Sequence, residues 1–254
     1  MKDIEYVLEF AAGLGGRMLH AGANLERSND TMQRVCSSYH LKDVSIYSLC
    51  SIIQISARTE DGDYAYYQAS VPAKDTHLTR LEKLNRLSRE VCRDTPDPKS
   101  LMWMLEHADG KEPESRLYRL AGWLVAIDCL CVLYGGTIGD IIATSLIVAA
   151  MSWLLRILYS KKLNTLIVNA ACMLFAGSMG EILVWTGLGQ QFNIICISCS
   201  MMLIPGIGLT NAFRNLLCGN EMNGILEMLK ALLEALAIVL GIVVSAYLFG
   251  GLTS

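Results

Sequence analysis

Charge is scarce in the second half of this 254-residue chain. Of its 45 Lys, Arg, Asp and Glu residues, 33 fall at or before Arg116, and the other 12 are spread over the last 138 positions. A water-soluble domain has no use for so long a charge-poor stretch, whereas helices that cross a bilayer require one. The distribution therefore excludes an entirely soluble protein and predicts membrane helices after Arg116.

Other shortages narrow the class further. The formal net charge is −3, so the chain lacks the basic excess of a dedicated nucleic-acid-binding protein. Its nine cysteines are odd in number and most of the later ones lie in apolar runs, so a disulfide framework is not expected. Asp3 and Glu5 stand where a signal peptide would carry only positive charge. The front of the chain is therefore expected to stay in the cytoplasm.

Catalytic and metal-binding patterns are also missing. The four histidines all precede Arg116 and lack the spacing of metal ligands. The segment 13–16 (GLGG) lies within a helix pattern rather than after a strand, which indicates helix packing and not a nucleotide-binding loop. Cys196 and Cys199 have redox-motif spacing, but their apolar surroundings indicate core or lipid-facing residues. We predict no enzyme activity, no cofactor and no metal.

The first 115 residues predict a small soluble α+β domain. Ser28 is the predicted N-cap of its second helix, and two β-forming segments around a Glu60–Asp63 turn signal predict a hairpin. The predicted elements are, in order, a helix over 4–22, a helix from Ser28 to about Tyr39, strands over 44–58 and 64–71, a helix over 77–92 ended by 95–98, and a polar stretch over 108–113.

Residues 116–254 predict five membrane-spanning helices. Each apolar run is close to the ~20 residues that a helix needs to cross ~30 Å of hydrocarbon, and open sheet edges cannot face lipid. The runs cover about 117–134, 138–157, 163–185, 192–212 and 225–249. The predicted fold class is therefore an α-helical integral membrane protein, with five transmembrane helices after a small soluble α+β domain.

Positive charges predict one orientation of these spans. The cations that mark the inner side are Arg116, Arg119, Arg156, Lys161, Lys162 and Arg214. The connections after the first and third spans, and the last five residues, have no Lys or Arg. The front domain is therefore expected inside and the carboxyl terminus outside, which requires an odd number of spans.

Three acidic residues within the spans are candidate ligands for substrate or protons. Asp128 lies near the middle of the first span, Glu181 late in the third and Glu234 in the fifth. A charge at membrane depth costs roughly 3 kcal/mol or more, so such residues usually face a bundle interior or a water-filled path. Glu227 and Lys230 lie at helical spacing from Glu234, and for these two simple pairing at the interface is an equally good interpretation.

The fourth span contains a helix-breaking sequence, 204–208 (IPGIG). Broken helices expose backbone amides and carbonyls, which transporters use to hold substrates near the midplane; a simple packing kink is the alternative. Polar side chains follow the break directly. The candidate binding residues here are Pro205, Gly206, Gly208, Thr210, Asn211 and Arg214.

Three stretches of the chain resemble the threonine/serine exporter family. They are 16–27 (GRMLHAGANLER), Tyr134-Gly-Gly136 with Asp140 after it, and 205–219 (PGIGLTNAFRNLLCG). The chain has Asn24, Asn215 and Asn220 where members of that family commonly have acids. A proton or cation role at 215 and 220 is therefore not carried over.

The resemblance covers the whole chain but corresponds to the amino-terminal half of the long exporters. It implies a second small membrane subunit that supplies the other half, as in split members, one pair of which is associated with succinate export. It also implies a location in the bacterial plasma membrane and a small-molecule substrate; homo-oligomer formation stays open.

Three functions are compared. The leading one is proton-coupled export of threonine or serine, with an acid among Asp128, Glu181 and Glu234 for the ammonium group. Dicarboxylate export is the second, which the scarcity of cations in the spans disfavours. A membrane-tethered enzyme or sensor that works through the soluble domain is the third, although only Ser28, Asp30 and His40 could be nominated as its catalytic residues.

Overall fold

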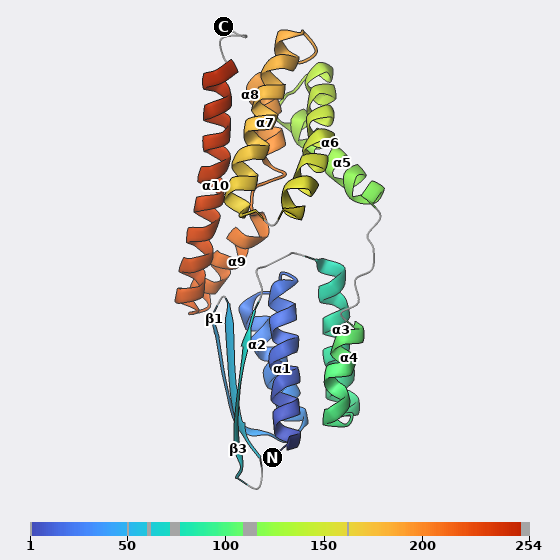
Figure 1. Cartoon of the computed structure of the whole chain (residues 1–254), viewed down its shortest axis with the longest axis vertical. Coiled ribbons are helices and arrows are strands. Elements are labelled where there is room, and N and C mark those ends of the chain that lie inside the picture. Colours follow the sequence, from blue (N-terminus) through green and yellow to red (C-terminus); the bar gives the residue numbers. More distant parts are fainter. Residues whose placement is uncertain are drawn as a thin grey trace. The chain divides into compact units, whose positions relative to one another are not determined.

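The computed structural model describes residues 2–49, 51–59, 62–71, 77–108, 116–161 and 163–249. The chain divides into two compact units (Figure 1). The first unit comprises Met1–Glu112 together with Thr210–Glu227, and the second comprises Pro113–Leu209 together with Met228–Ser254. A segment from the back half of the sequence thus belongs to the same unit as the front domain.

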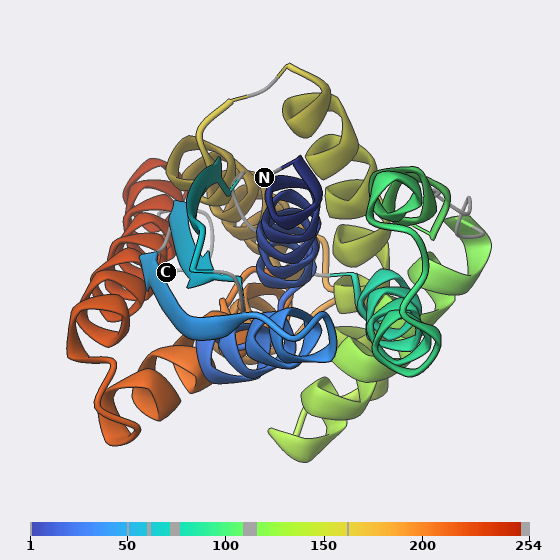
Figure 2. The same cartoon turned by 90° about the horizontal axis from the view of Figure 1, so that it is seen from below.

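In the first unit, helix α1 lies between a sheet and a helical pair (Figure 2). The helices are α1 (Lys2–His20), α2 (Leu25–Ser38), α3 (Leu78–Asp94), the 3-10 helix η1 (Pro98–Ser100) and α4 (Leu101–Ala108). Within the described ranges the sheet has the order β1 (Lys42–Leu49), β2 (Ile52–Arg58), β3 (Tyr64–Ser70), and all its pairings are antiparallel. The predicted α+β character of the front domain is confirmed.

The core of this unit forms around α1 because apolar side chains recur on its faces at helical spacing. Phe10, Leu14 and Met18 are completely buried. A Cβ atom on Gly15 would lie 2.4 Å from Met32 Sδ, so only glycine allows α2 to approach α1 this closely. The predicted helix-packing role of the segment 13–16 is therefore confirmed.

Two local predictions for this unit are wrong. Asn24, not Ser28, caps α2, because the Asn24 side chain accepts a hydrogen bond from Arg27 N at 2.8 Å. Ser28 is buried and donates to Gly15 O at 3.0 Å. The segment 44–58 is two strands rather than one, since β1 and β2 pair from Leu49↔Ile52 onward and the chain reverses between these residues.

The later part of the front domain agrees with its predicted helix and adds one. The helix expected over 77–92 is α3, which ends before Thr95 in the left-handed conformation. Helix α4 was not predicted. Most of the polar stretch 108–113 lies outside the described residues.

The second unit is built from long apolar helices. They are α5 (Arg116–Leu133), α6 (Ile138–Ser160), α7 (Thr165–Trp185) and α8 (Phe192–Ser200), while α9 (Gly206–Leu217) and α10 (Glu221–Phe249) are divided between the units. Among the described helices, three are long and apolar enough to cross a bilayer: Ile138–Ser160, Thr165–Trp185 and Glu221–Phe249. A helical membrane protein is confirmed.

The prediction of five spanning helices is not supported. The first predicted span forms α5, but its 18 residues include Arg116, Arg119 and Asp128, which lower its hydrophobicity. The fourth predicted span is interrupted, because α8 ends at Ser200 and α9 starts at Gly206. The helix-breaking sequence predicted within this run therefore prevents one continuous helix.

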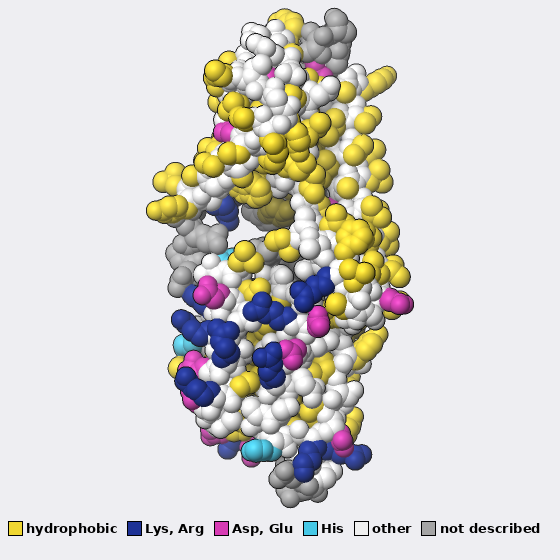
Figure 3. Space-filling model, turned by 180° about the vertical axis from the view of Figure 1, so that it is seen from behind, with side chains coloured by type: hydrophobic (Ala, Val, Ile, Leu, Met, Phe, Trp, Pro, Cys, Tyr) yellow, Lys and Arg dark blue, Asp and Glu magenta, His cyan; other side chains and the backbone are white. Residues whose placement is uncertain are grey.

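The surface of the second unit is largely apolar, whereas charged side chains gather over the first (Figure 3). Trp153 is 68% exposed and Tyr247 is 89% exposed, and many leucines of α10 are similarly uncovered. Its interior packs Ile147, Met151 and Cys172 among α6, α7 and α8. An apolar exterior of this extent is typical of a surface that faces lipid.

Helices α7 and α10 approach each other closely through small residues. A Cβ atom on Gly241 would lie 2.5 Å from Ala170 O, and one on Gly177 would overlap Ser245 Oγ. Gly241 on α10 lies beside Ala170 on α7, and Ser245 lies beside Gly177. The later residue of α10 thus faces the later residue of α7, so the two helices run parallel. Contacts of small residues are what lets membrane helices pack at close range.

Candidate functional site

The three acids predicted inside the spans are shielded to different degrees. Glu181 on α7 is 2% exposed and Glu234 on α10 is 7% exposed. Asp128 on α5 is half-buried. Ionisable groups in lipid are unfavourable unless they face protein or water, so this inward placement is what a functional route through the helices requires.

Asp128 combines one satisfied and one unsatisfied carboxylate oxygen. Ser145 Oγ on α6 donates to Asp128 Oδ2 at 2.8 Å. Asp128 Oδ1 is buried and has no hydrogen-bond partner among the described residues. A buried acceptor without a partner is unfavourable by about 1–3 kcal/mol, so this oxygen is suited to receive a proton or a donor group of a ligand.

The acids do not meet at one point. The contacts of Gly177 with Ser245 align the two parallel helices, and they place Glu181 level with the carboxyl-terminal end of α10. Glu181 is level with Phe249, which follows Glu234 by 15 residues on α10. At 1.5 Å per residue, Glu181 and Glu234 are therefore about 22 Å apart along the helix axes. The predicted acids thus occupy two depths of the second unit.

Helix α8 packs against α5, α6 and α7, and so lies among the helices that carry Asp128 and Glu181. Ser198 Oγ is a further buried polar atom without a hydrogen-bond partner among the described residues. At the other depth, Lys230 Nζ lies 3.9 Å from Glu234 Oε1.

The predicted interruption of the fourth apolar run is present and begins earlier than expected. Residues 201–204 form turns after α8, and Pro205 precedes α9. Proline has no N–H group and cannot continue the hydrogen-bond ladder. A Cβ atom on Gly206 would meet nothing within 4 Å, and one on Gly208 would meet only Pro205 Cβ at 3.7 Å. These glycines therefore do not serve close packing between helices.

The polar residues after the break belong to the first unit. Thr210 is exposed, Asn211 is half-buried, and Arg214 Nη2 lies 3.2 Å from Glu26 Oε2. The side chains of Arg214 and Glu26 are 54% and 56% exposed, and ion pairs this exposed contribute only about 0–1 kcal/mol. Neither unit therefore holds Arg214 together with the three acids.

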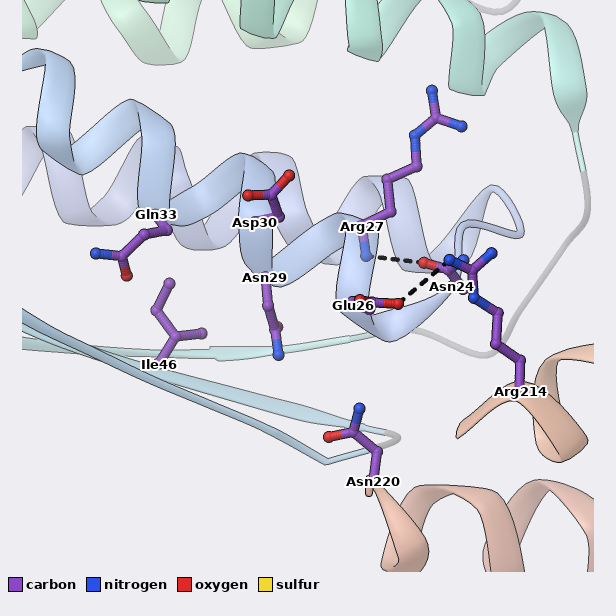
Figure 4. Close-up of a pocket in the computed structure, with 9 residues that line it drawn as sticks. All are labelled: Asn24, Glu26, Arg27, Asn29, Asp30, Gln33, Ile46, Arg214 and Asn220. Atoms are coloured by element: carbon purple, nitrogen blue, oxygen red, sulfur yellow. Dashed lines mark hydrogen bonds and ion pairs between the residues drawn. The ribbon is translucent and has the colours of Figure 1, made fainter. Parts of the chain in front are cut away.

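A polar pocket of about 730 Å³ surrounds this ion pair (Figure 4). Asn29 on α2 and Asn220 before α10 point toward one another, while Glu26 and Arg214 meet at one end. The residues that line the pocket are Asn24, Glu26, Arg27, Asn29, Asp30, Gln33, Ile46, Arg214 and Asn220.

Hydrogen bonds hold the wall of this pocket in place. Ser48 Oγ on β1 donates to Asn29 Oδ1 at 2.7 Å. Asn223 Nδ2 in the first turn of α10 donates to Ser48 O at 2.9 Å, and both of these residues are buried. One serine therefore joins α2, β1 and the start of α10.

Sequence reasoning selected Arg214 but missed its partner Glu26 and the amides of the pocket. The sequence did contain one indication of this pairing, because Glu26 and Arg214 lie in two of the family-like stretches, 16–27 and 205–219. These two residues are far apart in sequence and form the ion pair of the pocket. The asparagines that stand in place of common acids have separate roles: Asn24 caps α2, Asn220 lines the pocket, and Asn215 Nδ2 donates to Glu227 Oε2 at 3.0 Å.

Two of the residues nominated for a catalytic role, Ser28 and Asp30, make local structural contacts. Ser28 is bonded to Gly15 O, and Asp30 pairs with Arg34 on its own helix. Across the described ranges, no group of three or more His, Cys, Asp and Glu side chains could hold a metal ion. His77 Nδ1 accepts from Arg80 N and so caps α3.

Long apolar helices define the class of this protein as a helical membrane protein, and buried carboxylates and an interrupted helix are features that many transporters share. The chain belongs to the threonine/serine exporter (ThrE) family, whose model matches residues 9–249. A membrane exporter is therefore the general function of this chain. No curated protein and no solved structure matches it significantly.

Proposed function

We propose that this chain is one subunit of an exporter of threonine or serine that works by alternating access in the bacterial plasma membrane. The observation that supports it most is the burial of Glu181 and Glu234 and of one Asp128 oxygen within apolar helices. Such groups are retained where a polar solute or a proton must pass. The family correspondence suggests that a second small membrane subunit completes the transporter.

The chemistry of an amino acid fits these groups. Its ammonium group is a donor, and Asp128 Oδ1 is a buried acceptor. Its carboxylate needs donors, and the amino-terminal turn of α9, which begins directly after Pro205, is a position where a helix favours anions. An acid that does not hold substrate is available to carry a coupling proton, since protonation removes the cost of a buried charge.

Dicarboxylate export is less well supported. A dianion needs two cationic partners, yet Lys230 lies close to Glu234 and Arg214 pairs with Glu26. If this alternative holds, Arg214→Gln should impair export of a dicarboxylate more than export of threonine. We place the first unit in the cytoplasm and the carboxyl terminus outside, because the cations Arg156, Lys161 and Arg214 follow that orientation.

The test is transport by the full chain and its co-purifying membrane subunit in vesicles. We expect labelled threonine and serine to accumulate under a proton gradient. The variants Asp128→Asn, Glu181→Gln and Glu234→Gln are each assayed for gradient-driven uptake and for exchange. Loss of uptake with retained exchange marks the proton-carrying acid, and loss of both marks the substrate ligand.

Glu221→Gln is the matched control, because Glu221 is an exposed acid at the start of α10. Its rates should equal those of the unaltered protein. Vesicles that move neither threonine nor serine with either gradient direction would contradict the proposal. Turnover of a metabolite by the full chain, unaffected by the three acid substitutions, would instead favour a membrane-tethered enzyme.

A further inference from the structure

We infer that the pocket between α2, β1 and the 210–227 segment is a recognition site for a free hydroxy amino acid, in which Glu26 binds the ammonium group and Arg214 binds the carboxylate. The inference rests on the proposed function for its choice of ligand. It adds a site that lies wholly in the first unit, outside the membrane helices.

The first argument is charge complementarity. A zwitterion presents one positive and one negative group a few bonds apart, and Glu26 and Arg214 present the opposite pair at one end of the pocket (Figure 4). Each charge has a favourable position, since Glu26 is in the first turn of α2 and Arg214 is near the carboxyl-terminal end of α9. Both charged side chains therefore stay at favourable positions when a ligand separates the ion pair.

The second argument is that this ion pair is easily exchanged. A single contact at 3.2 Å joins Arg214 Nη2 to Glu26 Oε2, and both side chains are more than half exposed. Exposed pairs contribute little to stability. A ligand can thus take over both charges while the fold is maintained by the partly buried hydrogen bond of Ser48 with Asn29 and the buried one of Asn223 with Ser48.

The third argument concerns the hydroxyl group of the ligand. Asn29 and Asn220 point toward one another across the pocket, and a side-chain amide offers both a donor and an acceptor. A site that hydrogen-bonds a hydroxyl rejects an analogue without it, because its own polar groups lose a partner. The volume of about 730 Å³ lies within the roughly 300–1,000 Å³ of small-molecule sites.

Cys218 provides a probe next to Glu26 of this site. Its exposed Sγ atom lies 3.7 Å from Glu26 Oε2. The experiment measures the rate of maleimide modification at Cys218 by mass spectrometry, in the full chain purified with its membrane subunit. We expect threonine and serine to slow the rate at least fivefold, with threonine amide, N-acetylthreonine and valine at least tenfold weaker in half-effective concentration.

Single substitutions test which side chain binds which group of the ligand. Arg214→Gln should make the half-effective concentrations of threonine and threonine amide equal. Glu26→Gln should do the same for threonine and N-acetylthreonine. Asn220→Ala should reduce the preference for threonine over valine. Arg93→Gln, which breaks an exposed ion pair with Asp94 on α3, is the matched control and should leave protection unchanged. Melting temperatures within about 2 °C of the unaltered protein show that folding is intact.

The outcomes separate this inference from the proposed function. Transport of threonine with an unprotected Cys218, and with normal rates in Glu26→Gln and Arg214→Gln, would overturn the site and leave the exporter proposal standing. Protection without transport would uphold the site and contradict the exporter proposal. Protection that persists in both variants would show that the ion pair is only structural, and the inference would be wrong.

Discussion

A single buried carboxylate organises one end of the second unit. Asp140 is completely buried, and its oxygens accept hydrogen bonds from Thr137 N and Oγ1 and from the backbone N–H groups of Gln190 and Gln191, at 2.7–2.9 Å. The same side chain therefore caps α6 and holds the loop between α7 and α8. Sequence analysis had noticed Asp140 only as part of a family-like stretch.

We predict that Asp140→Ala lowers stability by about 3 kcal/mol or more, because several charge-assisted hydrogen bonds to a buried carboxylate are lost. The measurement is the melting temperature of the protein in detergent. Asp97→Ala is the control, since Asp97 is an exposed cap of the 3-10 helix η1 and its loss should cost about 1 kcal/mol or less. Equal shifts for the two variants would contradict the assignment.

Thiol chemistry in the first unit should follow burial. Cys36 is completely buried, and burial raises the pKa of its thiol to about 12. Because the thiolate is the reactive form, Cys36 should resist maleimide at pH 8 while the exposed Cys218 reacts. Mass spectrometry of the folded and unfolded protein checks this, and rapid modification of Cys36 in the folded protein would refute it.

The same pKa shift has a consequence for stability. A group whose pKa is raised by folding favours the folded state below its unfolded pKa and loses that contribution as the pH rises through the folded value. The contribution of Cys36 should therefore be complete below about pH 9 and decline toward pH 12. A Cys36→Ala variant should show a weaker loss of melting temperature between these two pH values.

At the scale of elements, the sequence predicted helix and strand segments well but missed some of their ends and the reversal within the segment 44–58. Asn24 and Ser28 are both good capping residues, and only the packing of Ser28 against Gly15 decided between them. The strand segment 44–58 is continuous in β-propensity, and its reversal between Leu49 and Ile52 depends on pairing with itself. Propensity is local, whereas these choices depend on contacts made elsewhere.

The contact of α7 with α10 should depend on the absence of a side chain at Gly241. Gly241→Val would place atoms about as close as 2.5 Å to Ala170 O, so α10 must move away. We predict a loss of about 1–3 kcal/mol, the usual cost of overpacking, seen as a lower melting temperature. Gly122→Val on α5 is the control, since a Cβ atom there meets nothing within 4 Å. A neutral Gly241→Val would mean that the two helices are not packed as described.

For the whole molecule, the orientation of the chain in the membrane is testable with cysteines. In a Cys129→Ala background, Cys218 should react with an impermeant maleimide only from the cytoplasmic side, because it follows the cation Arg214. A cysteine introduced at the exposed Thr186, between α7 and α8, should react only from the outside. Labelling of both positions from one side would show that the orientation is wrong.

The sequence alone determined the membrane character of the second half, the α+β character of the front domain and the family, because hydrophobicity and local motifs are properties of neighbouring residues. Tertiary structure decided where the polar residues go. It separated Glu181 from Glu234 and joined Arg214 to Glu26 across 188 positions. Such meetings depend on how helices pack and not on any nearby pattern, so only the folded chain could show that the candidate substrate residues divide between two units.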